Sequence, residues 1–116
     1  MLEIGSGWGS LAIRAAQRGA RVTAITLSRE QMRLARERVE AAGLTGLAEV
    51  RVQDYREVEG LFDAIVSVEM IEAVGEAYWP AYFAALDRLL APGGTVAIQA
   101  ITMDHQRFLA TRRSFS

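Results

Sequence analysis

Three glycines at every second position form the stretch of this 116-residue chain that is best suited to bind a ligand. They are Gly5, Gly7 and Gly9, and an apolar strand that contains Glu3 leads directly into them. Glycine permits a positive φ and lets the backbone approach a ligand closely, because it has no Cβ. A helix pattern begins immediately afterwards, and a helix N-terminus carries a partial positive charge. The stretch therefore predicts a site where backbone N–H groups meet an anionic group; a tight turn without a ligand is the alternative.

The composition excludes several kinds of chemistry. The chain has no cysteine and no lysine, so disulfides, thiolate zinc sites, Walker A phosphate loops and Schiff-base lysines are excluded. His105 is the one histidine, and we expect no metal site. A net charge of −1 with 51% hydrophobic residues predicts a folded domain that does not bind nucleic acid through bulk basic charge. No apolar run is long enough to span a bilayer.

Strand and helix patterns alternate along the chain, which predicts an α/β fold. The expected strands are 1–4, 21–26, 48–53, 62–68 and 95–101, and the expected helices are 11–16, 29–42 and 78–90. We expect a doubly wound, Rossmann-like and mostly parallel sheet in which the strands, numbered along the chain, lie in the order 3-2-1-4-5. Such sheets bind ligands beyond the carboxyl ends of their strands, at the switch point between strands 1 and 4. The polar tail after residue 101 is expected to be partly helical.

The helix pattern 29–42 carries an N-terminal cap and a run of arginines. Ser28 fits the N-cap position, and Gln31 lies three residues later, as a capping box requires. The arginines at 29, 33, 36 and 38 fall mostly away from the apolar stripe, and we interpret them as a solvated helix face.

Three nucleotide-type ligands compete for the glycine loop. A dinucleotide fingerprint needs a third glycine where Ser10 stands, and a carboxylate after the second strand, where 25–28 has none. The absence of lysine excludes a phosphate loop of the Walker type. S-adenosylmethionine, the third candidate, carries both a carboxylate and an ammonium at its amino-acid end. N–H groups in the range Gly5–Gly7 can take the carboxylate, and Glu3 can orient the ammonium directly or through water.

Several motifs together resemble one family, the cyclopropane-fatty-acyl-phospholipid synthases, which include the mycolic acid cyclopropane synthases. They belong to the class I S-adenosylmethionine-dependent methyltransferases. The resemblance covers essentially the whole chain, and its most specific parts are G-W-G, T-L-S-x-x-Q and V-S-V-x-M-x-E. The motifs are E-I-G-S-G-W-G (3–9), I-T-L-S-R-E-Q (25–31), Q-D-Y-R (53–56), F-D-A-I-V-S-V-E-M-I-E-A-V-G (62–75), Y-F-A-A-L-D-R-L-L-A-P-G-G (82–94) and I-Q-A-I-T (98–102).

The resemblance implies a set of residues that bind the cofactor. They comprise Gly5, Ser6 and Gly7 at the methionine end, with Glu3; Thr26, Leu27 and Gln31 on the ribose side; Gln53, Asp54 and Tyr55 around the adenine; and Val68 as an apolar wall near the sulfonium. Two of these have a purely structural alternative, because Tyr55 fits a capped strand end and Gln31 fits a capping box.

The resemblance also implies a reaction, in which a methyl or methylene group is transferred to the double bond of an unsaturated phospholipid acyl chain. Methyl addition makes a carbocation, which must lose a proton to close a cyclopropane ring. A bound bicarbonate is the implied base, held by a glutamate that matches Glu72; a solvated loop acid or helix cap is the alternative. Gln99 stands where some members have histidine, and an amide cannot titrate. Transfer without ring closure therefore fits as well.

The implied protein is a cytoplasmic enzyme, peripheral to the membrane, and longer than this chain. The family has a helical segment before the first strand and further strands after the fifth, so we expect 1–116 to be a single cofactor-binding core truncated at both ends. Strand 95–101 would then keep an exposed edge. A methyltransferase for a small molecule and a domain that binds S-adenosylmethionine without catalysis are the alternative functions. The sequence does not specify the acyl substrate or the oligomeric state.

Overall fold

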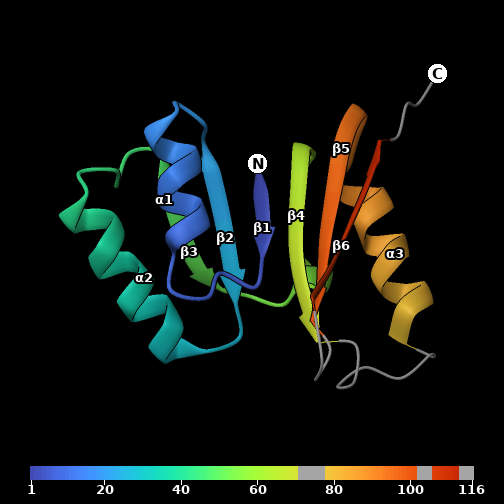
Figure 1. Cartoon of the computed structure of the whole chain (residues 1–116), viewed down its shortest axis with the longest axis horizontal. Coiled ribbons are helices and arrows are strands. Elements are labelled where there is room, and N and C mark those ends of the chain that lie inside the picture. The colour runs from blue at the N-terminus through green and yellow to red at the C-terminus, as the bar shows by residue number, and fades with distance from the viewer. Residues whose placement is uncertain (71–77, 102–105, 113–116) are drawn as a thin grey trace. The chain divides into compact units, whose positions relative to one another are not determined.

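The computed structural model describes residues 1–70, 78–101 and 106–112, with side-chain burial for 1–67 and 80–98. Two compact units follow each other along the chain, Met1–Glu57 and Val58–Ser116. Figure 1 colours the chain from blue in the first unit to red at the end of the second.

The first unit is a three-stranded parallel sheet with two helices. Its elements are β1 (Leu2–Ile4), α1 (Ser10–Gln17), β2 (Val22–Thr26), α2 (Arg29–Ala41), β3 (Ala48–Val52) and the 3-10 turn η1 (Tyr55–Glu57). β2 pairs in parallel with both β1 and β3.

The core of this unit is built from small apolar side chains. Alanines and valines from both helices and from β2 and β3 pack together on one face of the sheet, and Figure 1 shows α1 in front of these strands. Because alanine and valine are short, the helices can lie close to the strands, and burial of these side chains stabilises the unit. The buried members are Ala12, Ala16, Val22, Ala24, Ala35, Val39, Ala48 and Val50.

The second unit contains β4 (Phe62–Met70), α3 (Tyr78–Leu89), β5 (Leu90–Ile101) and β6 (Gln106–Arg112). β5 pairs in parallel with β4 and antiparallel with β6. Tyr82 of α3 is fully buried, and its hydroxyl is hydrogen-bonded to the buried Ser67 hydroxyl of β4. Arg88, at the other end of α3, donates to the Val58 carbonyl at 2.8 Å. These two hydrogen bonds attach α3 to the segment that it covers.

The strand order is β3-β2-β1-β4-β5-β6. The predicted α/β class and the predicted order 3-2-1-4-5 are therefore confirmed. No helix in the described part of the chain is both long enough and apolar enough to cross a membrane.

The tail differs from the prediction. Residues 106–112, expected to be partly helical, form β6, which pairs with β5 from Thr95 to Ile101. The expectation that this edge of β5 stays exposed is therefore wrong. An open edge leaves a row of N–H and C=O groups unsatisfied, and the antiparallel strand satisfies them.

β5 also begins earlier than predicted, at Leu90 rather than Thr95. The register against β4 is irregular there, because Phe62 pairs with Leu90 and Ala64 pairs with Thr95. A glycine is needed at position 94, because a Cβ there would lie only 3.0 Å from the Asp63 carbonyl oxygen. Pro92, Gly93 and Gly94 therefore lie within β5 rather than in a turn before it.

Candidate cofactor site

The glycine loop has the backbone conformation that its sequence predicts. Gly5, Gly7 and Gly9 have φ of 87°, 52° and 89°, in the left-handed region that favours glycine. The N–H groups of Gly5 and Ser6 both donate to the Ile25 carbonyl, at 2.9 and 3.1 Å. The N–H groups of Gly5 and Ser6 are thus already paired within the protein, and these two hydrogen bonds attach the loop to β2. The assignment of Gly5–Gly7 to a ligand carboxylate stays a prediction.

The donors that remain lie further along the loop. In the part of the chain that the structure describes, no group accepts from the N–H of Gly7 or Trp8. A Cβ at Gly7 would meet nothing within 4 Å, so the loop is open on that side. α1 begins three residues later without a side-chain cap at its N-terminus. Uncapped N–H groups at a helix start, next to open loop N–H groups, form an arrangement that binds anions.

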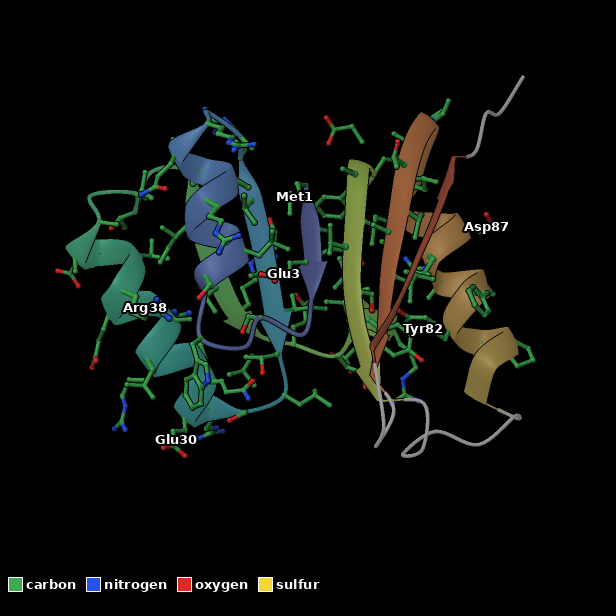
Figure 2. All side chains as sticks on the ribbon, viewed as in Figure 1. Met1, Glu3, Glu30, Arg38, Tyr82 and Asp87 are labelled. Atoms are coloured by element: carbon green, nitrogen blue, oxygen red, sulfur yellow. The ribbon has the colours of Figure 1, made fainter. Side chains whose placement is uncertain are left out.

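Glu3 is a buried carboxylate with an oxygen that pairs with none of the described residues. Its side chain lies on β1, just before the loop (Figure 2), and only 3% of the residue is exposed. Its Oε1 is buried and makes no hydrogen bond to any described residue. Burial raises the pKa of Glu3 from 4.5 to about 7. A buried carboxylate in this state binds a cation favourably, because a cation supplies the missing partner for its charged form.

The end of β2 holds a small hydrogen-bond network. The Thr26 hydroxyl accepts from the Ser28 N–H and donates to Gln31 Oε1, both at 3.1 Å. Ser28 caps α2 by accepting from the Gln31 N–H at 3.2 Å, which confirms the predicted N-cap. In a complete capping box the Gln31 side chain would accept a hydrogen bond from the Ser28 N–H, but here the Thr26 hydroxyl accepts it instead. Leu27 is 75% exposed beside this network.

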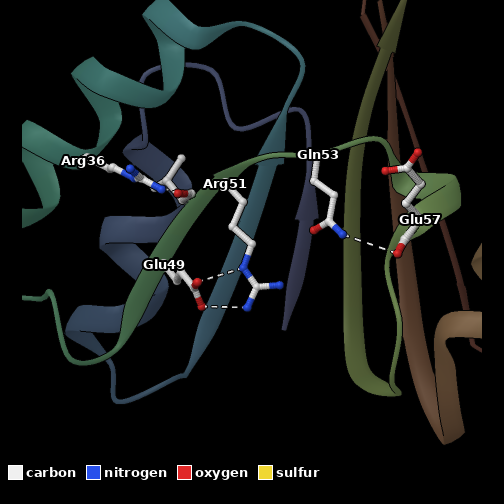
Figure 3. A network of polar contacts seen from close by, with 6 residues as sticks. Arg36, Glu49, Arg51, Gln53 and Glu57 are labelled. Atoms are coloured by element: carbon white, nitrogen blue, oxygen red, sulfur yellow. Dashed lines mark hydrogen bonds and ion pairs between the residues drawn. The ribbon is translucent and has the colours of Figure 1, made fainter.

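The end of β3 carries the residues predicted to surround adenine. The Gln53 N–H donates to the Thr26 carbonyl at 3.0 Å, which joins this end to β2. Figure 3 shows the Gln53 amide, whose Nε2 donates to the Glu57 carbonyl at 3.3 Å. Its Oε1 is buried and has no partner among the described residues. Gln53 therefore keeps an acceptor that no described residue satisfies.

Asp54 and Tyr55 follow Gln53. The Asp54 carboxylate accepts three hydrogen bonds from Arg56. The Arg56 backbone N–H donates one at 2.9 Å, and the Arg56 guanidinium donates the others at 3.1 and 2.7 Å. The Arg56 guanidinium holds the pKa of Asp54 below its usual value. Tyr55 is half-buried and begins η1. Both residues lie where they were predicted, at the carboxyl end of β3, and Asp54 already has a cationic partner.

The arginines of α2 are exposed, as predicted for a solvated helix face, but two of them also make hydrogen bonds. Arg36 Nε donates to the Val50 carbonyl at 2.8 Å, and Arg38 Nη1 donates to the Trp8 carbonyl at 3.0 Å. No sequence pattern separates these two from Arg33, because all three are arginines on the same helix.

The remaining predicted residues belong to the second unit. Val68 and Gln99 are register partners on β4 and β5, near the carboxyl ends of both strands. Their side chains are outside the described set, and Glu72 lies outside the described residues altogether.

The fold is that of a doubly wound α/β domain, and the residues predicted to bind a nucleotide-type ligand in the first unit lie in its glycine loop and at the ends of β2 and β3. Among solved structures, the crystal structure of mycolic acid cyclopropane synthase CmaA1 complexed with SAH and CTAB is similar, with a TM-score of 0.75 and 26% identity. The match covers 84% of this chain and 35% of that one. This similarity assigns the fold to the S-adenosylmethionine-dependent methyltransferases.

The family model described as mycolic acid cyclopropane synthetase matches residues 1–115, and the chain belongs to this family. Tuberculostearic acid methyltransferase UfaA1 from Mycobacterium tuberculosis (strain ATCC 25618 / H37Rv) is 62% identical over 114 residues, which are 98% of this chain and 27% of that protein. Cyclopropane-fatty-acyl-phospholipid synthase from Escherichia coli (strain K12) is 41% identical over 102 residues, covering 87% and 26% respectively. The family resemblance read from the motifs is thus confirmed. The chain spans about a quarter of the length of these relatives.

Proposed function

We propose that this chain is the cofactor-binding core of an S-adenosylmethionine-dependent methyltransferase that modifies the double bond of an unsaturated fatty acyl chain. One observation carries the cofactor assignment: the buried, unpartnered carboxylate of Glu3 beside a loop with open N–H groups. The acyl substrate is supported by the names of the relatives, a tuberculostearic acid methyltransferase and a cyclopropane-fatty-acyl-phospholipid synthase.

The residues at the loop fit the amino-acid end of the cofactor. Glu3 supplies an anion for the ammonium, and this contact favours the ionised form of Glu3. The N–H groups of Gly7 and Trp8, with those of the first turn of α1, supply donors for the carboxylate. When bound, S-adenosylmethionine provides an electrophilic methyl group.

The residues at the ends of β2 and β3 fit the nucleoside. Gln31 is oriented by Thr26, and its amide nitrogen is left to donate to a ribose hydroxyl. Leu27 offers an apolar surface, and the buried Oε1 of Gln53 offers an acceptor to a ligand N–H or O–H. Tyr55 and Asp54 complete the adenine side, with Asp54 held in place by Arg56.

For the chemistry on the acyl chain we assign roles to Glu72, Gln99 and Val68. Methyl addition to a double bond leaves positive charge on the chain, and a nearby carboxylate stabilises such charge. Glu72 takes this role and would also hold bicarbonate, which would supply a base at the reacting chain. Gln99 donates an amide hydrogen bond to that anion, and Val68 excludes water near the reacting methyl. The acyl chain belongs to a phospholipid, reached from the cytoplasmic side of the membrane.

Lipid analysis of cells that express the whole protein tests this function. We expect new cyclopropane, methylated or methylene acyl chains, and their loss by at least about tenfold in Glu72→Gln. Glu37→Gln, on the exposed side of α2, is the matched control and should leave the product level unchanged.

Two other outcomes would redirect the assignment. An unchanged lipid profile, with turnover of S-adenosylmethionine on another acceptor, would indicate a small-molecule methyltransferase. Binding of S-adenosylmethionine without any turnover would indicate a binding domain. A Glu72→Gln variant with full activity would remove Glu72 from the mechanism.

A further inference from the structure

We infer that Arg38 is a positioning residue, which holds the glycine loop in the conformation that receives the amino-acid end of the cofactor. This inference rests on the proposed function. Arg38 lies on α2 (Figure 2), and its Nη1 donates to the Trp8 carbonyl at 3.0 Å and to the Ser10 hydroxyl at 3.4 Å. One side chain thus joins α2 to the loop and to the first residue of α1.

A second contact, a packing contact one turn earlier on α2, supports the same loop. A Cβ at Gly9 would lie 3.2 Å from the Cβ of Ala35, so the loop and the helix are already in close contact there. Ala35 is fully buried. Ala35 and Arg38 are three residues apart and therefore lie on one face of α2. The helix supports the loop at two successive points, by packing at Gly9 and by hydrogen bonds at Trp8 and Ser10.

The peptide between Trp8 and Gly9 is held at both ends. Its carbonyl accepts from Arg38, and its N–H, on Gly9, donates to the Ser6 carbonyl at 3.0 Å. This peptide cannot rotate without breaking both hydrogen bonds. Because its carbonyl is directed to Arg38, that oxygen is kept from turning toward a bound carboxylate, which it would repel. The neighbouring N–H groups of Gly7 and Trp8 stay available on the open side of the loop.

The two ends of α2 serve different halves of the ligand. Ser28 and Gln31 at its start belong to the hydrogen-bond network on the nucleoside side. Arg38 lies seven residues after Gln31, roughly 10 Å along the helix axis. Loss of Arg38 should therefore loosen the methionine side and leave the nucleoside side intact.

Calorimetry with two ligands separates this role from a general structural one. S-adenosylhomocysteine has the amino-acid end, and 5′-methylthioadenosine has the same nucleoside without it. In the whole protein, Arg38→Met should weaken the binding of S-adenosylhomocysteine about fivefold to tenfold, as the net effect of losing the hydrogen bonds to Trp8 and Ser10. Its affinity for 5′-methylthioadenosine should change less than about twofold. Arg38→Lys, which keeps a cationic donor, should recover part of the loss.

The matched control is Arg33→Met, on the same helix, where the side chain makes no hydrogen bond or ion pair to any described residue. It should leave both affinities unchanged. Equal weakening of both ligands by Arg38→Met, or no weakening of S-adenosylhomocysteine, overturns the inference.

Amide hydrogen exchange of the ligand-free protein gives a readout that needs no cofactor. The Gly9 amide should exchange faster in Arg38→Met than in the wild type, while the amides of β2 remain unchanged. Unchanged exchange at Gly9 contradicts the inference. A wild-type protein that binds neither ligand overturns the proposed function, and the exchange result then decides alone whether Arg38 holds the loop.

Discussion

Two carboxylates of the first unit, Glu3 and Asp54, are in opposite situations. Glu3 is buried, one of its oxygens has no partner, and its pKa is raised to about 7. Asp54 accepts three hydrogen bonds from Arg56, and its pKa is lowered. Among the described residues, Asp54 therefore has a cationic partner in Arg56, and Glu3 has none. This difference agrees with the proposal that the ammonium of the cofactor pairs with Glu3.

The largest predicted effect is on stability as a function of pH. The pKa of Glu3 is about 7 in the folded state, whereas an ordinary glutamate has a pKa of 4.5, so the folded state binds more protons than the unfolded state between these pH values. The free energy of unfolding of the ligand-free protein should therefore fall as pH rises from 4.5 to 7, by up to about 3 kcal/mol from this group. Urea unfolding between about pH 5 and pH 8 measures the fall.

Glu3→Gln is the control for that measurement, since glutamine has a similar shape and no charge. The variant should lack this component of the pH dependence and be at least as stable as the wild type above pH 7. The same fall in stability in both proteins would show that Glu3 is not the group responsible.

The glycines of the loop should differ in what they contribute. Gly9→Ala brings a Cβ to 3.2 Å from Ala35 and forces an unfavourable φ, so we expect a loss of about 1–3 kcal/mol in unfolding free energy. Gly7→Ala strains only φ, since its Cβ meets nothing within 4 Å, and should cost about 1 kcal/mol or less. The Gly7 variant should nevertheless bind S-adenosylhomocysteine more weakly, because the new methyl group stands on the open side. Equal destabilisation by both substitutions would contradict the packing role of Gly9.

The smallest predicted effect is that of Asp54→Asn. The Asp54–Arg56 ion pair is exposed on its arginine side, and such pairs contribute little to stability. The melting temperature at neutral pH should change by less than about 2 °C. Because the folded pKa of Asp54 is lowered, its stabilising effect is present above its ordinary value of 3.8 and is lost only in stronger acid. A large loss of stability near neutral pH would contradict this comparison, because it would show that Asp54, like Glu3, has a large effect on the free energy of unfolding.

Much of the fold was predictable because its signals are local. Alternating strand and helix patterns predicted the parallel order, and Ser28 before an apolar stripe predicted the start of α2. The three positive-φ glycines were predictable for the same reason, since only glycine tolerates that conformation well.

The details of the site depend on register and could not be read from the sequence. The Ile25 carbonyl accepts from Gly5 and Ser6 only because β1 and β2 pair Ile4 with Ile25. Arg38 reaches Trp8 across 30 residues of sequence, and nothing in its neighbours distinguishes it from a solvated arginine. β6 pairs with the edge of β5, and the polar composition of the tail does not predict this strand pairing.

The most direct test of the central claim is a calorimetric titration of the whole protein with S-adenosylhomocysteine at about pH 6.5, in two buffers of different ionisation enthalpy. At this pH the carboxyl of Glu3 is mostly protonated, and an arriving ammonium favours its ionised form. Wild-type protein should bind and release roughly half a proton or more per ligand. Glu3→Gln should bind at least about tenfold more weakly and release none. Equal affinity in the two proteins, with no dependence on buffer, would contradict the assignment of Glu3 to the ammonium of the cofactor.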